Sequence, residues 1–187
     1  HLLYVEQPWH RNVALSDSIG ALAKAWPDRP PIIIDESDAE NGSLRGALAL
    51  GYAGTSHKNC KGVFKSVANA CLLAQRRAAG QPAVMSGEDL ANVGPVALVQ
   101  DLAAQAALGV TTVERNGHHY FAGLAQFPAA WQRHALAAHG DVFTPTPVGW
   151  PRVNIRDGRL ALGSVNAAPF GVPGEVGMAG FHPVPLE

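Results

Sequence analysis

Apolar residues recur along the chain in short runs, separated by longer segments of helical periodicity. The short runs predict β-strands at residues 2–6, 32–35, 53–58, 82–86 and 110–114. After each run, apolar residues spaced three and four apart predict helices at residues 13–26, 40–50, 63–79, 95–108 and 128–139. Strands that alternate with helices are typical of a parallel α/β sheet.

About five strand–helix units fill residues 1–143. An eight-unit barrel takes about 250 residues, so five units do not close one. The chain also starts inside a strand, with no turn or cap before it. We therefore expect an α/β fold that is the C-terminal portion of a TIM-like barrel, with about three strands before His1. A complete open α/β sheet is the alternative.

Residues 144–187 break this alternation. They begin with a Thr-Pro-Thr-Pro linker, and segments 152–155 and 159–162 flank Asp157-Gly158, a strong hairpin-turn signal. The remainder is rich in Gly and Pro, which predicts an extended tail that wraps another part of the molecule. The sequence therefore divides into a partial barrel, 1–143, and a hairpin with a tail, 144–187.

Composition and charge narrow the classes of function. The 187 residues are 47% hydrophobic and 16% charged, with a formal net charge of -1, which is enough apolar surface for a core. Basic blocks are absent, which argues against a nucleic-acid surface, and neither a membrane span nor a signal peptide is evident. Cys60 and Cys71 form no metal-ligand pattern and are interpreted as reduced thiols. A cytoplasmic enzyme is expected.

Three of the predicted strands end on a charged residue, namely Glu6, Asp35 and Lys58. In a parallel barrel the C-terminal ends of the strands meet at the active-site mouth, so these side chains are expected in one pocket. Carboxylate oxygens suit Mg²⁺, which predicts a metal site at Glu6 and Asp35. For each carboxylate alone, the alternative is a helix cap or an ion pair with arginine.

Lys58 is the candidate base. A lysine that ends a buried strand is desolvated, and desolvation lowers its pKa toward neutrality. Lys61 and Lys65 are expected to be ordinary solvated charges, and His57 a packing or surface residue. Two alternatives remain for Lys58: a surface lysine in a loop, or the Schiff-base nucleophile of an aldolase, since a desolvated amine serves that chemistry equally.

Further acidic candidates lie near the ends of the fourth and fifth strands. Glu88 and Asp89 come just past the fourth, and Glu114 ends the fifth. Each is weak evidence alone, because acidic residues are common in loops. The pair His118-His119 is not expected to chelate a metal, because neighbouring residues of an extended segment point to opposite sides.

Several of these motifs resemble the enolase superfamily, of the mandelate racemase and muconate lactonizing type. Glu6-Gln7-Pro8 is similar to one strand end of that family, and Asp35-Glu36-Ser37 to its next metal-ligand strand. His57-Lys58-Asn59-Cys60-Lys61-Gly62 is similar to the K-x-x-K-x-G strand end that supplies a base lysine in the lactonizing and dipeptide-epimerase branches. Glu88 falls where those branches carry an acidic residue, and residues 153–162 resemble the closing hairpin.

The resemblance implies a (β/α)7β barrel and an N-terminal capping domain that would precede His1 and against which the hairpin and tail would pack. It also implies Mg²⁺ held by three carboxylates on successive strands, with Glu6 and Asp35 as the second and third. Lys58 and Glu88 would be the catalytic residues. The histidine–aspartate pair of the mandelate racemase branch is not apparent.

The reaction implied by the resemblance is removal of the proton alpha to the carboxylate of a small-molecule substrate, through a metal-stabilised enediolate. Racemisation, epimerisation, dehydration and cycloisomerisation all begin with this step, and the sequence does not choose between them. A homo-oligomer is expected, without nucleic-acid or membrane partners. The alternatives are the Schiff-base aldolase and a non-catalytic fragment that folds or assembles with a missing segment.

Overall fold

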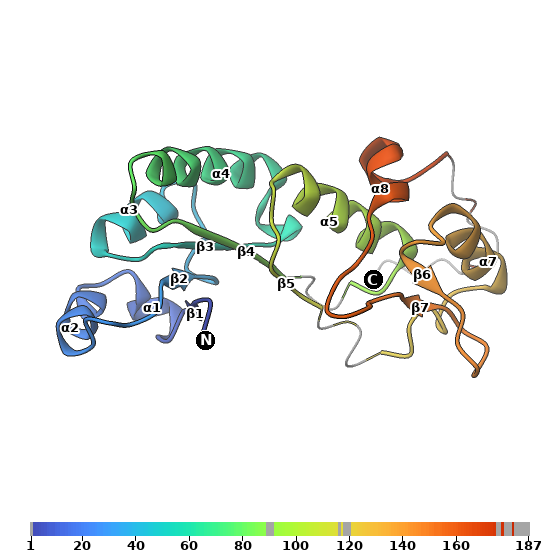
Figure 1. Ribbon diagram of the computed structural model, residues 1–187, viewed down its shortest axis with the longest axis horizontal. Coiled ribbons are helices and arrows are strands. Elements are labelled where there is room, and N and C mark those ends of the chain that lie inside the picture. The colour runs from blue at the N-terminus through green and yellow to red at the C-terminus, as the bar shows by residue number, and fades with distance from the viewer. Residues whose placement is uncertain are drawn as a thin grey trace, which may run out of the picture. The chain divides into compact units, whose positions relative to one another are not determined.

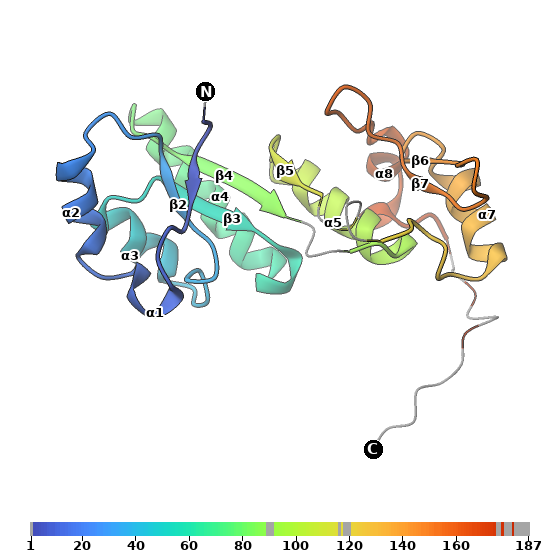
Figure 2. The same cartoon turned by 90° about the horizontal axis from the view of Figure 1, so that it is seen from below.

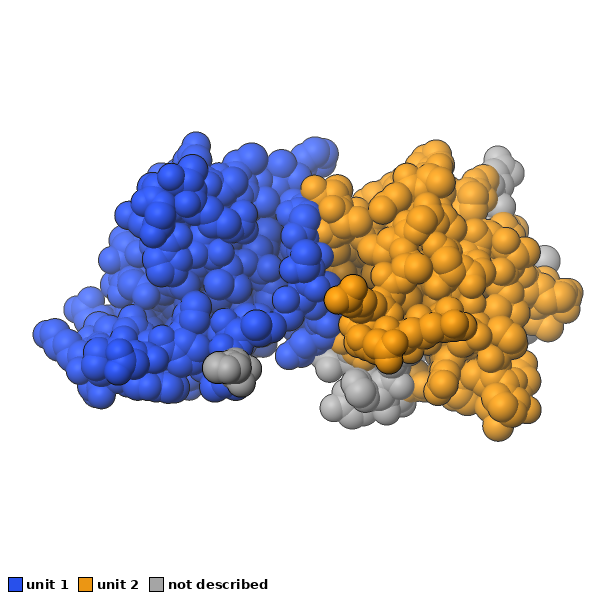
Figure 3. Space-filling model, viewed as in Figure 1, with its two compact units in different colours: residues 1–88, 108–114 blue, residues 89–107, 115–187 orange. Residues whose placement is uncertain are grey.

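The computed structural model describes residues 2–88, 92–115, 117, 121–174, 177 and 181. The chain forms two compact units, coloured separately in Figure 3. The first contains residues 1–88 and 108–114, and the second contains residues 89–107 and 115–187. The predicted boundary between residues 143 and 144 lies inside the second unit. Within the described residues, no helix has the length and apolar character needed to cross a membrane.

A parallel sheet of five strands, in the order β1-β2-β3-β4-β5, forms the centre of the first unit. Its strands are β1 (Val5–Glu6), β2 (Ile32–Ile34), β3 (Gly54–His57), β4 (Val84–Glu88) and β5 (Val113–Glu114). The sheet curls into a half-barrel that is compatible with part of a TIM-like barrel (Figures 1 and 2). The mixed α/β class with parallel strands, predicted from the alternation of apolar patterns, is confirmed.

A glycine allows the two central strands to approach closely. Gly54 of β3 pairs with Val84 of β4, and a Cβ at position 54 would lie 1.7 Å from the Val84 carbonyl oxygen. β4 begins two residues later than predicted and continues through Glu88. Glu88 is therefore the last residue of a strand rather than a loop residue, and the pleat of β4 sets the direction of its side chain.

Helices cover one face of this sheet. They include α2 (Ser18–Ala25), α3 (Ser43–Leu50) and α4 (Val63–Ala78), of which α3 and α4 lie close to the predicted positions. Apolar residues of α2, α3 and β2, together with one residue after α3, form one buried cluster: Ile19, Ile32, Ile34, Ala47 and Tyr52. Ile33 points to the opposite face, because side chains alternate along a strand. Glu6 is its register partner on β1, so Glu6 also faces away from the helices.

The single helix predicted at 13–26 is wrong, because the segment divides into α1 (Arg11–Ala14) and α2. Ser16 lies at the break. Its hydroxyl donates to the Val13 carbonyl at 2.6 Å, and it accepts from the Ser18 backbone N–H at 3.4 Å. Serine side chains compete with helical backbone bonds in this way, which favours a helix boundary over a continuous helix.

The second unit packs helices against a short antiparallel sheet. Its main elements are α5 (Pro95–Ala107), α7 (Ala129–Ala138), β6 (Phe143–Thr144) and β7 (Arg152–Val153). The helices confirm the predictions for 95–108 and 128–139. The buried residues of this core include Leu98, Val99, Leu102, Leu124, Ala135, Val142, Phe143, Val153 and Val165.

Two expectations for the C-terminal part are corrected in this unit. β7 pairs with β6, so the predicted hairpin around Asp157-Gly158 is reduced to one bridge between Arg156 and Arg159. Residues 163–171 are not extended, since they form α8 (Gly163–Ala167) and the 3-10 helix η2 (Pro169–Gly171). Both pack on α5, where a Cβ at Gly171 would lie 2.4 Å from the Val99 carbonyl oxygen.

Candidate functional site

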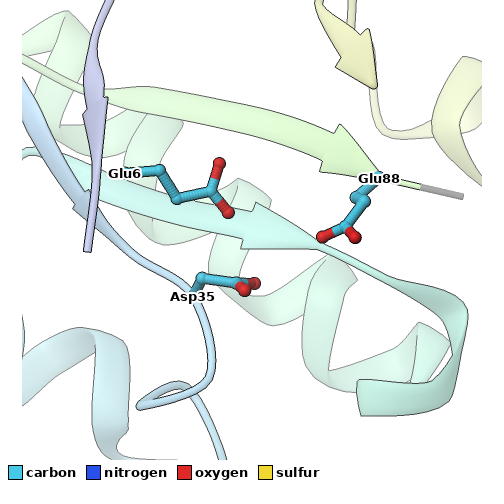
Figure 4. Close-up of side chains that lie close together, drawn as sticks. All are labelled: Glu6, Asp35 and Glu88. Atoms are coloured by element: carbon cyan, nitrogen blue, oxygen red, sulfur yellow. The ribbon is translucent and has the colours of Figure 1, made fainter. Parts of the chain in front are cut away.

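Three carboxylates converge at the C-terminal ends of the first four strands. Glu6 ends β1, Asp35 follows β2, and Glu88 ends β4. One ligand oxygen of each lies within 4.8 Å of the others, and Figure 4 shows the three side chains turned toward one another. The neighbouring positions of Glu6 and Asp35 on adjacent parallel strands are those expected from the sequence.

Lys58, the residue after β3, reaches into the same cluster. Its Nζ lies 2.7 Å from Asp35 Oδ2 and 2.6 Å from Glu88 Oε2, and its side chain is 7% exposed. Burial lowers the pKa of Lys58, but the hydrogen bonds and charges of Asp35 and Glu88 outweigh it and raise that pKa above its ordinary value. The expectation that desolvation makes Lys58 a neutral base is therefore wrong for this arrangement, in which Lys58 is an ammonium ion.

Lys61 is a second cation of the cluster and not a solvated charge as predicted, since its side chain is only 12% exposed. Its Nζ donates to Asp35 Oδ1 at 2.7 Å, to the Asp35 carbonyl at 2.8 Å and to the Ser56 carbonyl at 2.9 Å. Burial alone would raise the pKa of Asp35, but the hydrogen bonds from Lys58 and Lys61 outweigh it and hold that pKa below its ordinary value. Asp35 is therefore ionised and bridges two lysines.

Gln7 fixes the loop that carries Asp35, and sequence reasoning assigned it no such role. Its Oε1 accepts from the backbone N–H groups of Asp35 and Ser37, each at 2.9 Å. Its Nε2 donates to Glu36 Oε2 at 3.0 Å. Gln7 also has a φ of 24°, in the region that favours glycine. The available signal was the Gln-Pro dipeptide directly after a strand-end acid.

Glu6 differs from the other two acids in that no cation among the described residues forms an ion pair with it. Among the described residues, no hydrogen bond or ion pair reaches its carboxylate. Burial, followed by the charges of Asp35, Glu114 and Glu88, raises the pKa of Glu6 from 4.5 to about 7. Lys58 lowers it too little to compensate. The Glu6 side of the cluster therefore carries uncompensated negative potential.

Replacing Glu6 by glutamine is expected to change how stability depends on pH. The folded state holds a proton on Glu6 up to about pH 7 and the unfolded state only to about pH 4.5, so the free energy of unfolding of wild type falls as the pH rises between those values. Glutamine does not titrate, so as the pH rises from 4.5 to 8 the free energy of unfolding of Glu6→Gln should increase by about 1–2 kcal/mol relative to that of wild type, after allowance for the partial exposure of Glu6. Urea unfolding in EDTA measures this, and a difference independent of pH would contradict it.

Asp38 and Lys65 form a separate buried network behind the sheet. Lys65 Nζ lies 3.3 Å from Asp38 Oδ1, and Thr55 and Asn69 donate to Asp38 Oδ2 at 2.9 and 3.0 Å. Lys65 is thus not the solvated charge predicted, because its ammonium pairs with the buried Asp38. Both serve packing between β3 and α4.

The remaining candidates lie at or beyond the margin of the cluster. His57 is 1% exposed and bonds Ser66 and Asn59, which fits the packing role predicted for it. Burial lowers its pKa. Glu114 ends β5, is exposed, and acts on Glu6 through its charge. The candidates Asp89 and His118-His119 lie outside the described residues.

Chemically, the cluster offers three oxygen donors for a cation beside an ammonium group that can give a proton. Carboxylate oxygens in this number suit a hard divalent ion such as Mg²⁺. Comparisons of the chain with models of protein families, with curated proteins and with solved structures find no match. The geometry of the cluster is therefore the basis on which a function is proposed.

Proposed function

We propose that this chain takes part in Mg²⁺-dependent removal of a proton alpha to a carboxylate, as a member of the enolase superfamily. The observation that carries the proposal is the convergence of Glu6, Asp35, Glu88 and Lys58 at neighbouring strand ends. The half-barrel supports a (β/α)7β architecture, of which the five strands would be one part. The substrate class is a small molecule with a carboxylate, and a cytoplasmic homo-oligomer remains the expectation.

The charges of the cluster fit a divalent cation. The acids of the cluster are Glu6, Asp35 and Glu88, with the charge of Glu114 acting on Glu6, whereas Lys58 and Lys61 supply two positive charges. When Glu6 is ionised, these four acids exceed the two cations by two charges, and no ion pair among the described residues reaches Glu6. Mg²⁺ held by Glu6 and Asp35, with Glu88 within reach, would bind the substrate carboxylate and stabilise the charge that develops on proton removal.

The side chains of the chain itself would place and move the proton. Lys58 lies between Asp35 and Glu88 as an ammonium ion, so in this arrangement it is a proton donor. To accept the alpha proton it must first leave these carboxylates and lose its own proton. Glu88 orients the Lys58 side chain through their 2.6 Å contact. Racemases, epimerases, dehydratases and cycloisomerases all need such a group, and the geometry favours none of them.

The aldolase alternative has less support. A Schiff-base lysine must attack a carbonyl as a neutral amine. Asp35 and Glu88 instead raise the pKa of Lys58 above its ordinary value, although burial acts in the other direction. A non-catalytic chain remains the outcome if neither metal binding nor proton exchange is found.

A calorimetric titration with MgCl₂ tests the metal-binding half of the proposal. Wild type is expected to bind Mg²⁺, and Glu6→Gln to bind it at least about tenfold more weakly, because one charged oxygen ligand is lost, a difference of about 1.4 kcal/mol. Glu40→Gln is the matched control, since Glu40 is exposed and outside the cluster. Absence of binding by wild type, or equal binding by wild type and Glu6→Gln, would remove the metal site.

A further inference from the structure

The two lysines that bind Asp35 are held in different ways. Lys61 uses its ammonium on Asp35 Oδ1 and on two backbone carbonyls, those of Asp35 and Ser56. An ammonium group has three N–H donors, so this set satisfies all of them. The backbone carbonyls are fixed by the fold, and Lys61 is therefore a permanent part of the loop that carries Asp35.

Lys58 has no comparable anchor among the described residues. Its described contacts are two carboxylate oxygens, Asp35 Oδ2 at 2.7 Å and Glu88 Oε2 at 2.6 Å. Both belong to side chains, and both carboxylates belong to the group of three whose oxygens lie within 4.8 Å of one another. The ammonium of Lys58 is therefore held by the same acids that a divalent ion in this cluster would use.

A divalent ion and the Lys58 ammonium would compete for these acids. Mg²⁺ binds oxygen ligands at about 2.0–2.1 Å and demands a near-octahedral arrangement, so it tolerates little displacement of its ligands. Two cations on one carboxylate oxygen also repel each other strongly in a site with little water. Lys61 contacts the other oxygen of Asp35, and two backbone carbonyls also hold it, so a metal on Asp35 Oδ2 would leave Lys61 in place.

We propose that Lys58 is the exchangeable cation of this cluster: a divalent ion displaces its ammonium from Asp35, while Lys61 stays in place. The inference rests on the proposed function and adds a coupling to it. Arrival of the metal and release of the Lys58 side chain toward the substrate are then one event. Because linked binding is reciprocal, the two effects are equal in free energy. The metal weakens the contact between Lys58 and Asp35, and that contact weakens the binding of the metal by the same amount.

Removal of the Lys58 charge tests the coupling. Lys58→Met should bind Mg²⁺ at least about tenfold more tightly than wild type in a calorimetric titration, which corresponds to about 1.4 kcal/mol. Lys24→Met is the control for loss of a positive charge, because Lys24 is exposed on α2, and its affinity should equal that of wild type. Equal or weaker binding by Lys58→Met would overturn the inference.

A second measurement uses wild-type protein and does not depend on whether a Lys58 variant folds. Lysines are acetylated with and without MgCl₂ and the modified peptides are quantified by mass spectrometry. Labelling of Lys58 should rise several-fold with Mg²⁺, while that of Lys61 and Lys24 should not change. If the protein binds Mg²⁺ but the labelling of Lys58 does not change, the inference is overturned and the proposed metal site is not. Absence of Mg²⁺ binding by both wild type and Lys58→Met overturns the proposed metal site together with the inference.

Discussion

Asp35→Asn is expected to lower the free energy of unfolding by about 3–5 kcal/mol, the cost of removing one partner from a buried ion pair. Lys58 and Lys61 both rely on this carboxylate, at 2.7 Å each, and their side chains are 7% and 12% exposed. A neutral amide leaves two buried ammonium groups without their shared counter-charge. Urea unfolding at pH 7 in EDTA measures the effect.

Asp28→Asn provides the matched control for this prediction. Asp28 carries the same chemical change but lies exposed in a turn after α2, so its effect should stay within about 0.5 kcal/mol. A loss below about 1 kcal/mol for Asp35→Asn would show that the lysines find other counter-charges, and that Asp35 is not the electrostatic centre of the cluster.

Lys58→Ala is expected to lower the rate of alpha-proton exchange by about 10²–10⁴-fold, the usual contribution of a positioned proton-transferring group. Lys58 contacts both Asp35 and Glu88, and in the proposed reaction it transfers the proton. The rate is measured as loss of the alpha-proton signal by NMR in D₂O, with Lys24→Ala as the control. Exchange at the wild-type rate would remove Lys58 from the mechanism.

Much of the cluster could be predicted because parallel strands bring their C-terminal ends together. Glu6, Asp35 and Lys58 end or directly follow strands whose apolar runs are visible in the sequence, so their convergence needs no side-chain detail. The position of Glu88 depended on where β4 ends. The predicted strand at 82–86 ended two residues early, so Glu88 was placed just past the strand instead of at its last position.

The state of the lysines could not be predicted from local sequence. Lys61 bonds a carboxylate 26 residues away, and Lys65 bonds Asp38, 27 residues away. Each looks like a surface charge in its own segment and becomes buried only when the loop after β2 meets the residues after β3. The pKa of Lys58 was misjudged for the same reason, since burial was visible in the pattern and its two acidic partners were not.

The positions at which helices and strands end also depend on contacts that the periodicity of the sequence does not reveal. The apolar spacing over residues 13–26 is helical, yet Ser16 divides the segment through bonds of its hydroxyl. The Asp157-Gly158 signal does give a turn, with both residues at positive φ, but the strand after it is missing because β7 pairs with β6. Turn signals specify local geometry, and tertiary packing decides which strand becomes the partner.

The most direct test of the central claim is deuterium uptake at the alpha carbon of small carboxylates. The chain is incubated in D₂O with 2-hydroxy acids, amino acids and dipeptides, once with MgCl₂ and once with EDTA, and uptake is measured by NMR and mass spectrometry. The account predicts uptake by at least one substrate class with Mg²⁺, its loss in EDTA and its recovery when Mg²⁺ is restored. Uptake that is equal in Mg²⁺ and EDTA, or absent from every class, would contradict it.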